Sequence, residues 1–254
     1  MNLTAKALDI PQEIDPEEMM RRLAQTSRQM FLRGNLGMAS PRMVFQWHWA
    51  SLAPDTLPTP NILNVGCADD PLYFGSFAMH FDIDDWSAAH DHFTQGDAHA
   101  LPFVECEYHT VLIGDVHEHV KDPWQVTMEG ARVAGHRLAM TIFEELRLPG
   151  PGQHIVEGQR LGDEHSRALG YGDRLDAQAK LNPQRIGFPD DTNTPHLVHI
   201  NQFIDDDIVK LLKELVNRGF VVETALKALE IAEDTPAEYR WWNWLVSVRR
   251  GGAV

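Results

Sequence analysis

The sequence contains little cysteine and little positive charge, and each shortage disfavours a class of protein. Two cysteines, Cys67 and Cys106, among 254 residues are too few for a disulfide framework or an all-cysteine zinc site, so a reducing, cytoplasmic environment is expected. Lysine and arginine number 22 against 37 aspartates and glutamates, which gives a formal net charge of −15. Because nucleic-acid affinity depends largely on Lys and Arg contacts to phosphates, DNA and RNA are disfavoured as partners.

Long apolar stretches are also missing. No run approaches the roughly 20 residues that a membrane-spanning helix needs, and residues 1–6 lack the charged-then-apolar pattern of a signal peptide. We therefore expect a cytoplasmic protein without a membrane partner. A hydrophobic content of 43% over 254 residues is enough to bury a full core. No feature of the sequence sets an oligomeric state.

The most informative stretch, residues 62–71, reads as a buried strand that breaks into a tight turn and a helix start. Gly66 follows the strand and lets backbone amides approach a ligand closely. Asp70 and Pro71 then match an N-cap and a first helical residue. A turn of this kind is where α/β folds bind a nucleotide-like cofactor, although Asp70 itself is read first as a helix cap.

Acidic residues recur after the strands that follow. A second apolar run, residues 78–83, ends close to Asp82 and Asp84, where dinucleotide-binding folds place a carboxylate for ribose hydroxyls. Two further motifs come next, a Gly-Asp-Ala-x-x-Leu-Pro-Phe segment at residues 96–103 and an Asp-Val-His-Glu-His segment at residues 115–119. The spacing indicates alternating strands and helices.

This series of motifs resembles the class I S-adenosylmethionine (SAM)-dependent methyltransferases, particularly the small-molecule branch called type 11. The likeness is close over residues 61–145 and weak over residues 199–250. The first motif departs from it, because the usual Asp-Val-Gly-Cys-Gly-x-Gly reads Asn-Val-Gly-Cys-Ala-Asp-Asp at residues 64–70. The resemblance implies an α/β fold: a Rossmann-like, seven-stranded, mostly parallel sheet with helices on both faces and an antiparallel last strand.

The same resemblance divides the chain into four segments. Residues 1–60 are expected to form an N-terminal helical cap, and residues 61–145 the SAM-binding core. Residues 146–200, rich in glycine and proline, are expected to form an irregular substrate or lid insertion. Residues 201–254 would supply a C-terminal helix and a strand pair that completes the sheet.

The resemblance also implies which residues hold the cofactor SAM. Gly66 would lie near the methionine and ribose of SAM. Asp82 would bind the ribose hydroxyls, with Asp84 as the alternative if the strand is two residues longer. Asp97 and the Ala98 amide would contact the adenine, and Asp115 would line the cofactor floor. From the residues alone, Asp97 can equally be a turn residue that bonds its own backbone.

Methyl transfer to a hydroxyl also needs a base. The sequence has 13 histidines, and His119 follows directly on the expected fourth strand, where an imidazole of ordinary pKa suits proton abstraction. His119 is therefore the predicted catalytic residue. The weaker candidates are His117, His154, His165, His196 and His199.

Two His-x-His segments, residues 90–92 and 117–119, raise the question of a metal. Their imidazoles meet on one side only if the backbone is extended, and the sequence places no third ligand, so no metal is expected. Two functions stay open. One is a SAM-dependent methyltransferase acting on an oxygen or nitrogen of a small-molecule acceptor. The other is a catalytically inactive relative that serves as a binding or regulatory module, which the altered first motif makes credible.

Overall fold

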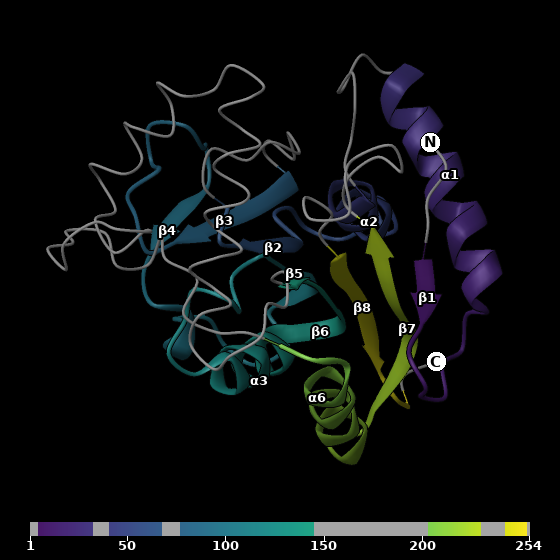
Figure 1. Ribbon diagram of the computed structural model, residues 1–254. Helices are drawn as coiled ribbons and strands as arrows, with labels where there is room; N and C mark the ends of the chain where they lie inside the picture. Colours follow the sequence, from purple (N-terminus) through teal and green to yellow (C-terminus); the bar gives the residue numbers. More distant parts are fainter. Residues whose placement is uncertain (1–4, 33–40, 68–76, 145–202, 230–241, 253–254) are drawn as a thin grey trace, which may run out of the picture.

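A single eight-stranded sheet with helices on both faces organises the protein (Figure 1). The computed structural model describes residues 5–32, 41–67, 77–144, 203–229 and 242–252. The strands are β1 (Ala5–Ala7), β2 (Ile62–Val65), β3 (Ala78–Asp82), β4 (Phe93–Gln95), β5 (Tyr108–Gly114), β6 (Ala134–Glu144), β7 (Phe220–Leu229) and β8 (Trp242–Arg250). The helices are α1 (Pro16–Leu32), α2 (Pro41–Ala50), α3 (Pro123–Val133) and α6 (Asp205–Asn217), with a short 3₁₀ helix, η2 (Ala98–Ala100).

The strand order is β1-β7-β8-β6-β5-β2-β3-β4. Strands β6, β5, β2, β3 and β4 run parallel to one another, whereas β8 is antiparallel to both β6 and β7. The predicted Rossmann-like, mostly parallel sheet with an antiparallel last strand is therefore confirmed.

The sheet has one strand more than the seven expected, because β1 pairs antiparallel with β7. It lies in the segment predicted to be a helical cap, and its three residues are too few to show a strand periodicity. The chain continues along the same edge after β1: the Leu8 and Glu13 amides donate to the Ala225 and Val222 carbonyls over 3.0 Å. Residues 5–14 thus cover the outer side of β7.

The order of the parallel strands places a topological switch between β2 and β5. From β2 the chain passes outward to β3 and β4, and it then returns to β5 on the other side of β2 and continues to β6. In open α/β sheets, ligands bind outside the carboxyl ends of the strands at such a switch. Gly66 and Asp115, which follow β2 and β5, lie at this point.

The two faces of the sheet bury separate apolar clusters. On one face, the fully buried Met19 of α1 and Trp49 of α2 belong to the cluster that contains Leu112 of β5. On the other face, α3 and α6 supply Val126 and Leu211 to the larger cluster. Figure 1 shows the two helix pairs on opposite sides of the sheet. This layering leaves the strand ends as the place where polar side chains gather.

A buried ion pair lies inside the α2 face. Arg137 of β6 donates to both carboxylate oxygens of Glu223 on β7, over 2.7 and 2.8 Å, and Ser247 donates a third bond of 2.8 Å. The guanidinium also lies 4.4 Å from the centroid of the Trp49 ring. The β7 register shifts between Val222 and Thr224, so Glu223 is the extra residue of a bulge. The bulge places this carboxylate opposite Arg137.

Candidate functional site

The turn after β2 requires a glycine. Gly66 has a φ of +71°, a conformation that L side chains rarely adopt, and a Cβ at this position would lie 2.2 Å from Cγ2 of Val116. Its amide donates to the Phe81 carbonyl over 2.8 Å. The turn is therefore tied to β3, and this amide is already used within the protein.

Strand β3 ends at Asp82, so it lacks the extra length on which the alternative, Asp84, depended. Asp84 lies in the bend beyond the strand, and its amide donates to Oδ1 of Asp82 over 3.1 Å. Both side chains are partly exposed. Of the two, Asp82 is the carboxylate at the strand end, where the ribose ligand was expected.

Asp97 caps η2, whose first residue is Ala98. Its Oδ1 accepts the His99 amide over 2.9 Å and also the His99 ring. Because the Asp122 amide donates to Nε2 of His99 over 3.1 Å, the ring proton lies on Nδ1 and faces Asp97. The backbone bond from His99 is the main cause that lowers the pKa of Asp97. Asp97 thus forms the local side-chain-to-backbone hydrogen bond that the sequence allowed for a turn residue. Its side chain remains 61% exposed.

Asp115 follows β5 with an unusual φ of +52° and makes three interactions with two residues, Thr141 and Arg42. Its amide donates to the Thr141 carbonyl over 3.0 Å, its Oδ1 accepts the Thr141 hydroxyl over 2.9 Å, and its Oδ2 pairs with Arg42 of α2. Gln46, one turn further along α2, donates to the same hydroxyl over 3.1 Å. Helix α2 therefore contributes directly to the predicted cofactor floor.

Sequence reasoning missed Arg42 and Gln46. They lie far from Asp115 in the chain, and no spacing links a helix in the N-terminal segment to a strand end in the core. The only available signal was the segment itself, which was predicted to cap the core. The structure adds a cation to a cofactor site whose predicted charged residues were all acidic.

The neighbouring histidines of the fourth-strand motif have different environments. His117 is fully buried, and its Nε2 lies 2.9 Å from the Thr127 hydroxyl. Since that hydroxyl donates to the Pro123 carbonyl over 2.9 Å, Nε2 of His117 carries the proton. Burial lowers the pKa of His117 to about 4. This weaker candidate is therefore a neutral core residue, out of reach of an acceptor.

His119 is partly exposed in the turn after β5, and its amide donates to the Val116 carbonyl over 3.0 Å. It remains the predicted base. The other candidates, His154, His165, His196 and His199, lie outside the described residues. Asp70 and the expected lid insertion also lie outside them.

We expect His117→Gln to flatten the pH dependence of stability between pH 6.5 and 4. The unfolded chain binds a proton at His117 below about pH 6.5, whereas the folded protein does so only near its pKa of about 4. Stability is therefore full above pH 6.5 and falls by about 3 kcal/mol as the pH drops through this window. Urea unfolding of both proteins across the window measures the difference. Identical slopes would show that His117 is accessible to protons in the folded state.

Within the described part of the chain, no helix has the length and apolarity needed to cross a membrane.

No protein-family model matches the sequence, and no curated protein matches it. Several solved structures are similar to it. The magnesium protoporphyrin IX methyltransferase ChlM from Synechocystis, with bound SAH, is 15% identical with a TM-score of 0.46, over 95% of this chain and 90% of that chain. A SAM-dependent methyltransferase from Methanosarcina mazei is 14% identical with a TM-score of 0.47, over 76% and 92%. The [4+2]-cyclase SpnF is 10% identical with a TM-score of 0.49, over 98% and 100%.

Proposed function

We propose that this protein is a SAM-dependent methyltransferase of the type 11-like branch, which transfers a methyl group to an oxygen or nitrogen of a small-molecule acceptor. The observation that carries the proposal is the meeting of the Gly66 turn, Asp82 and Asp115 at the carboxyl ends of β2, β3 and β5. Strands β2 and β5 flank the topological switch, β3 lies next to β2, and the three residues occur in the order that the sequence motifs imply.

The chemistry of these residues fits SAM. A ribose presents two vicinal hydroxyls, and the Asp82 carboxylate can accept hydrogen bonds from both. The amino-acid part of SAM carries a positive ammonium and a negative carboxylate. In the Arg42–Asp115 pair, Asp115 would face the ammonium and Arg42 the carboxylate. The exposed carboxylate of Asp97, with the Ala98 amide beside it, is assigned to the adenine.

SAM supplies an already activated methyl group, so the work left to the protein is alignment and proton removal. Asp82 and the Arg42–Asp115 pair would orient the donor at the strand ends. His119 would take up the acceptor proton when the acceptor is a hydroxyl, since a neutral imidazole at ordinary pH is a suitable base. An amine acceptor that is already neutral would depend less on His119.

Calorimetric titration with SAM tests the proposal, and Asp82→Asn with Asp84→Asn forms a matched pair. We expect wild-type protein to bind SAM with submillimolar affinity. Asp82→Asn should weaken binding by about tenfold to a hundredfold, because each charge-assisted hydrogen bond contributes about 1.5 to 3 kcal/mol. Asp84→Asn should change it little. Equal losses in both variants would remove the specific role of Asp82, and no binding by wild type would favour the noncatalytic module.

His119→Ala should lower turnover far more than SAM affinity. Removal of a general base costs about a hundredfold or more in rate, while a residue facing the acceptor contributes little to SAM binding. Formation of demethylated SAM across a panel of small hydroxyl and amine acceptors measures the rate. His92→Ala, another partly exposed histidine of the core segment, is the control. Turnover at the wild-type level in His119→Ala would place the base elsewhere.

A further inference from the structure

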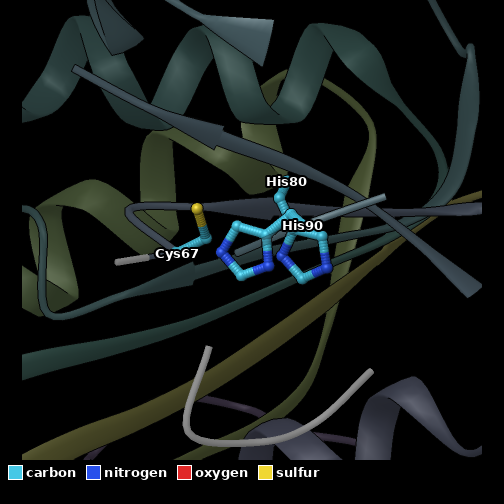
Figure 2. A group of neighbouring side chains, drawn as sticks. All are labelled: Cys67, His80 and His90. Atoms are coloured by element: carbon cyan, nitrogen blue, oxygen red, sulfur yellow. The ribbon is translucent and has the colours of Figure 1, made fainter. Parts of the chain in front are cut away.

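A cluster of nitrogen and sulfur donor atoms lies beside the turn after β2. Cys67 follows Gly66, His80 belongs to β3, and His90 lies between β3 and β4. One donor atom from each side chain falls within 4.8 Å of the other two. Figure 2 shows the Cys67 sulfur and the two imidazole rings gathered beside one another. The three residues come from the turn after β2, the middle of β3 and the loop that follows β3, so the fold itself brings them together.

The cluster is shielded from water. Cys67 is 3% exposed and His80 is fully buried, whereas His90 is partly exposed at the outer side. The two rings stack with centroids 3.9 Å apart and planes 9° from parallel, and the His90 ring also stacks on Phe93. Each side chain therefore has a defined place.

The donor set favours one class of metal ion. Two imidazole nitrogens and a thiol, with no carboxylate in the group, suit a borderline or soft ion and not Mg²⁺ or Ca²⁺, which prefer oxygen. Three protein ligands with a fourth open position match a common arrangement at zinc. A thiol that coordinates a metal ion of this class loses its proton and binds as a thiolate.

We propose that Cys67, His80 and His90 bind a Zn²⁺ ion. On binding, the Cys67 thiol loses its proton to solvent, a Zn–S bond forms, and one nitrogen of each neutral imidazole donates its lone pair. The fourth position is open to water. The site lies beside the Gly66 turn but uses none of the residues assigned to SAM, so it is independent of the proposed function.

Metal binding requires a small rearrangement that the structure allows. In a tetrahedral site, bond lengths of about 2.0 Å to nitrogen and 2.3 Å to sulfur separate the donors by about 3.3 to 3.6 Å. The three donor atoms, which lie within 4.8 Å, must therefore draw together by about an ångström. The metal must also lie in the plane of both rings, which parallel stacking prevents. A tilt of the partly exposed His90 ring out of the stack meets the second condition, and a rotation of the Cys67 side chain contributes to the first.

The sequence did not reveal this group, because its members have no zinc-type spacing. His80 comes 13 positions after Cys67, and His90 comes 10 positions after His80. His90 belongs to one of the His-x-His segments considered above, but the structure pairs it with His80 of the neighbouring strand and not with His92. The expectation of no metal rested on the absence of a third ligand in the sequence.

The test is titration of chelator-treated protein with Zn²⁺ by calorimetry and with Co²⁺ by absorption spectroscopy. We expect one Zn²⁺ per chain with micromolar or tighter affinity. Co²⁺ should give a tetrahedral spectrum with a thiolate charge-transfer band. Calorimetry in buffers of different protonation enthalpy should report the release of about one proton per metal, because the thiol ionises.

Cys67→Ser and His90→Gln should each weaken Zn²⁺ binding by about a hundredfold or more, since even residues that only support metal ligands contribute about ten- to a hundredfold. Cys106→Ser and His92→Gln are the matched controls, because Cys106 is exposed and His92 is outside the group. His90 is partly exposed, so its variant should fold, as circular dichroism will verify. Zn²⁺ affinity unchanged in Cys67→Ser, an octahedral Co²⁺ spectrum, or no binding by wild type would overturn the proposal.

Discussion

Arg137→Met is expected to lower the free energy of unfolding by about 3 to 5 kcal/mol, because it leaves a buried carboxylate without its partner. Arg137 and Glu223 are each less than a tenth exposed, and two hydrogen bonds join them. The variant also loses the contact of the guanidinium with Trp49. Chemical denaturation at neutral pH, followed by tryptophan fluorescence and circular dichroism, measures the change.

The matched control removes both charges. Arg137→Met combined with Glu223→Leu should recover much of the stability, because buried ion pairs are often replaced by apolar residues at little cost. If the single and double variants are equally unstable, loss of packing and not an unpaired charge explains the effect. A single variant as stable as wild type would show that the carboxylate finds another partner.

The same pair predicts an acid dependence. Burial alone would raise the pKa of Glu223, but the hydrogen bonds and charge of Arg137, with the Ser247 hydroxyl, outweigh it and hold the pKa below the usual value. The folded protein thus binds this proton less readily than the unfolded chain. The pair's contribution is present above the ordinary glutamate pKa and is lost as the pH falls through the lowered folded pKa. Arg137→Met should lack this component.

Gly66→Ala is expected to destabilise the protein by about 2 to 5 kcal/mol, through two separable costs. The left-handed φ of +71° disfavours any L side chain, and the new Cβ would lie 2.2 Å from Cγ2 of Val116. Thermal and urea unfolding of wild type and variant measure the sum. The turn precedes the proposed cofactor site, so SAM affinity should fall as well.

A double variant separates the two costs. In a Val116→Ala background the methyl group that meets the new Cβ is gone, so Gly66→Ala should cost only the backbone term of about 1 to 2 kcal/mol. An undiminished loss would show that the clash relaxes without penalty in the single variant. A vanishing loss would show that the turn tolerates the left-handed conformation with alanine.

The strands of the core could be predicted because their apolar runs and the turns between them are local. β2 ends directly before Gly66, and β3 matches the apolar run at residues 78–83 to within one residue. Asp115 follows β5 directly, as its motif indicates. The sequence already favours Asp82 over Asp84, but the strand end that separates the two depends on pairing with β4. Roles assigned by resemblance to Gly66, Asp97, Ala98, Asp115 and His119 remain predictions.

Features that depend on long-range contacts could not be predicted. The Arg42–Asp115 pair and the Cys67 group join residues that no periodicity relates. The bulge that places Glu223 opposite Arg137 interrupts the inward–outward alternation of side chains in β7. A sequence pattern based on regular alternation does not predict such an interruption. His117 and His119 are only two residues apart, yet burial separates their chemistry.

The segment that covers β7 also bears on how copies of the protein meet one another. An uncovered ten-residue strand would offer its backbone amides and carbonyls as a template for a second chain, a common start of aggregation. Residues 5–14 occupy that template with β1 and with bonds from Leu8, Glu13 and Ile14, while β4 at the opposite edge has only three residues. By occupying the edge of β7, residues 5–14 prevent a second chain from pairing with this strand.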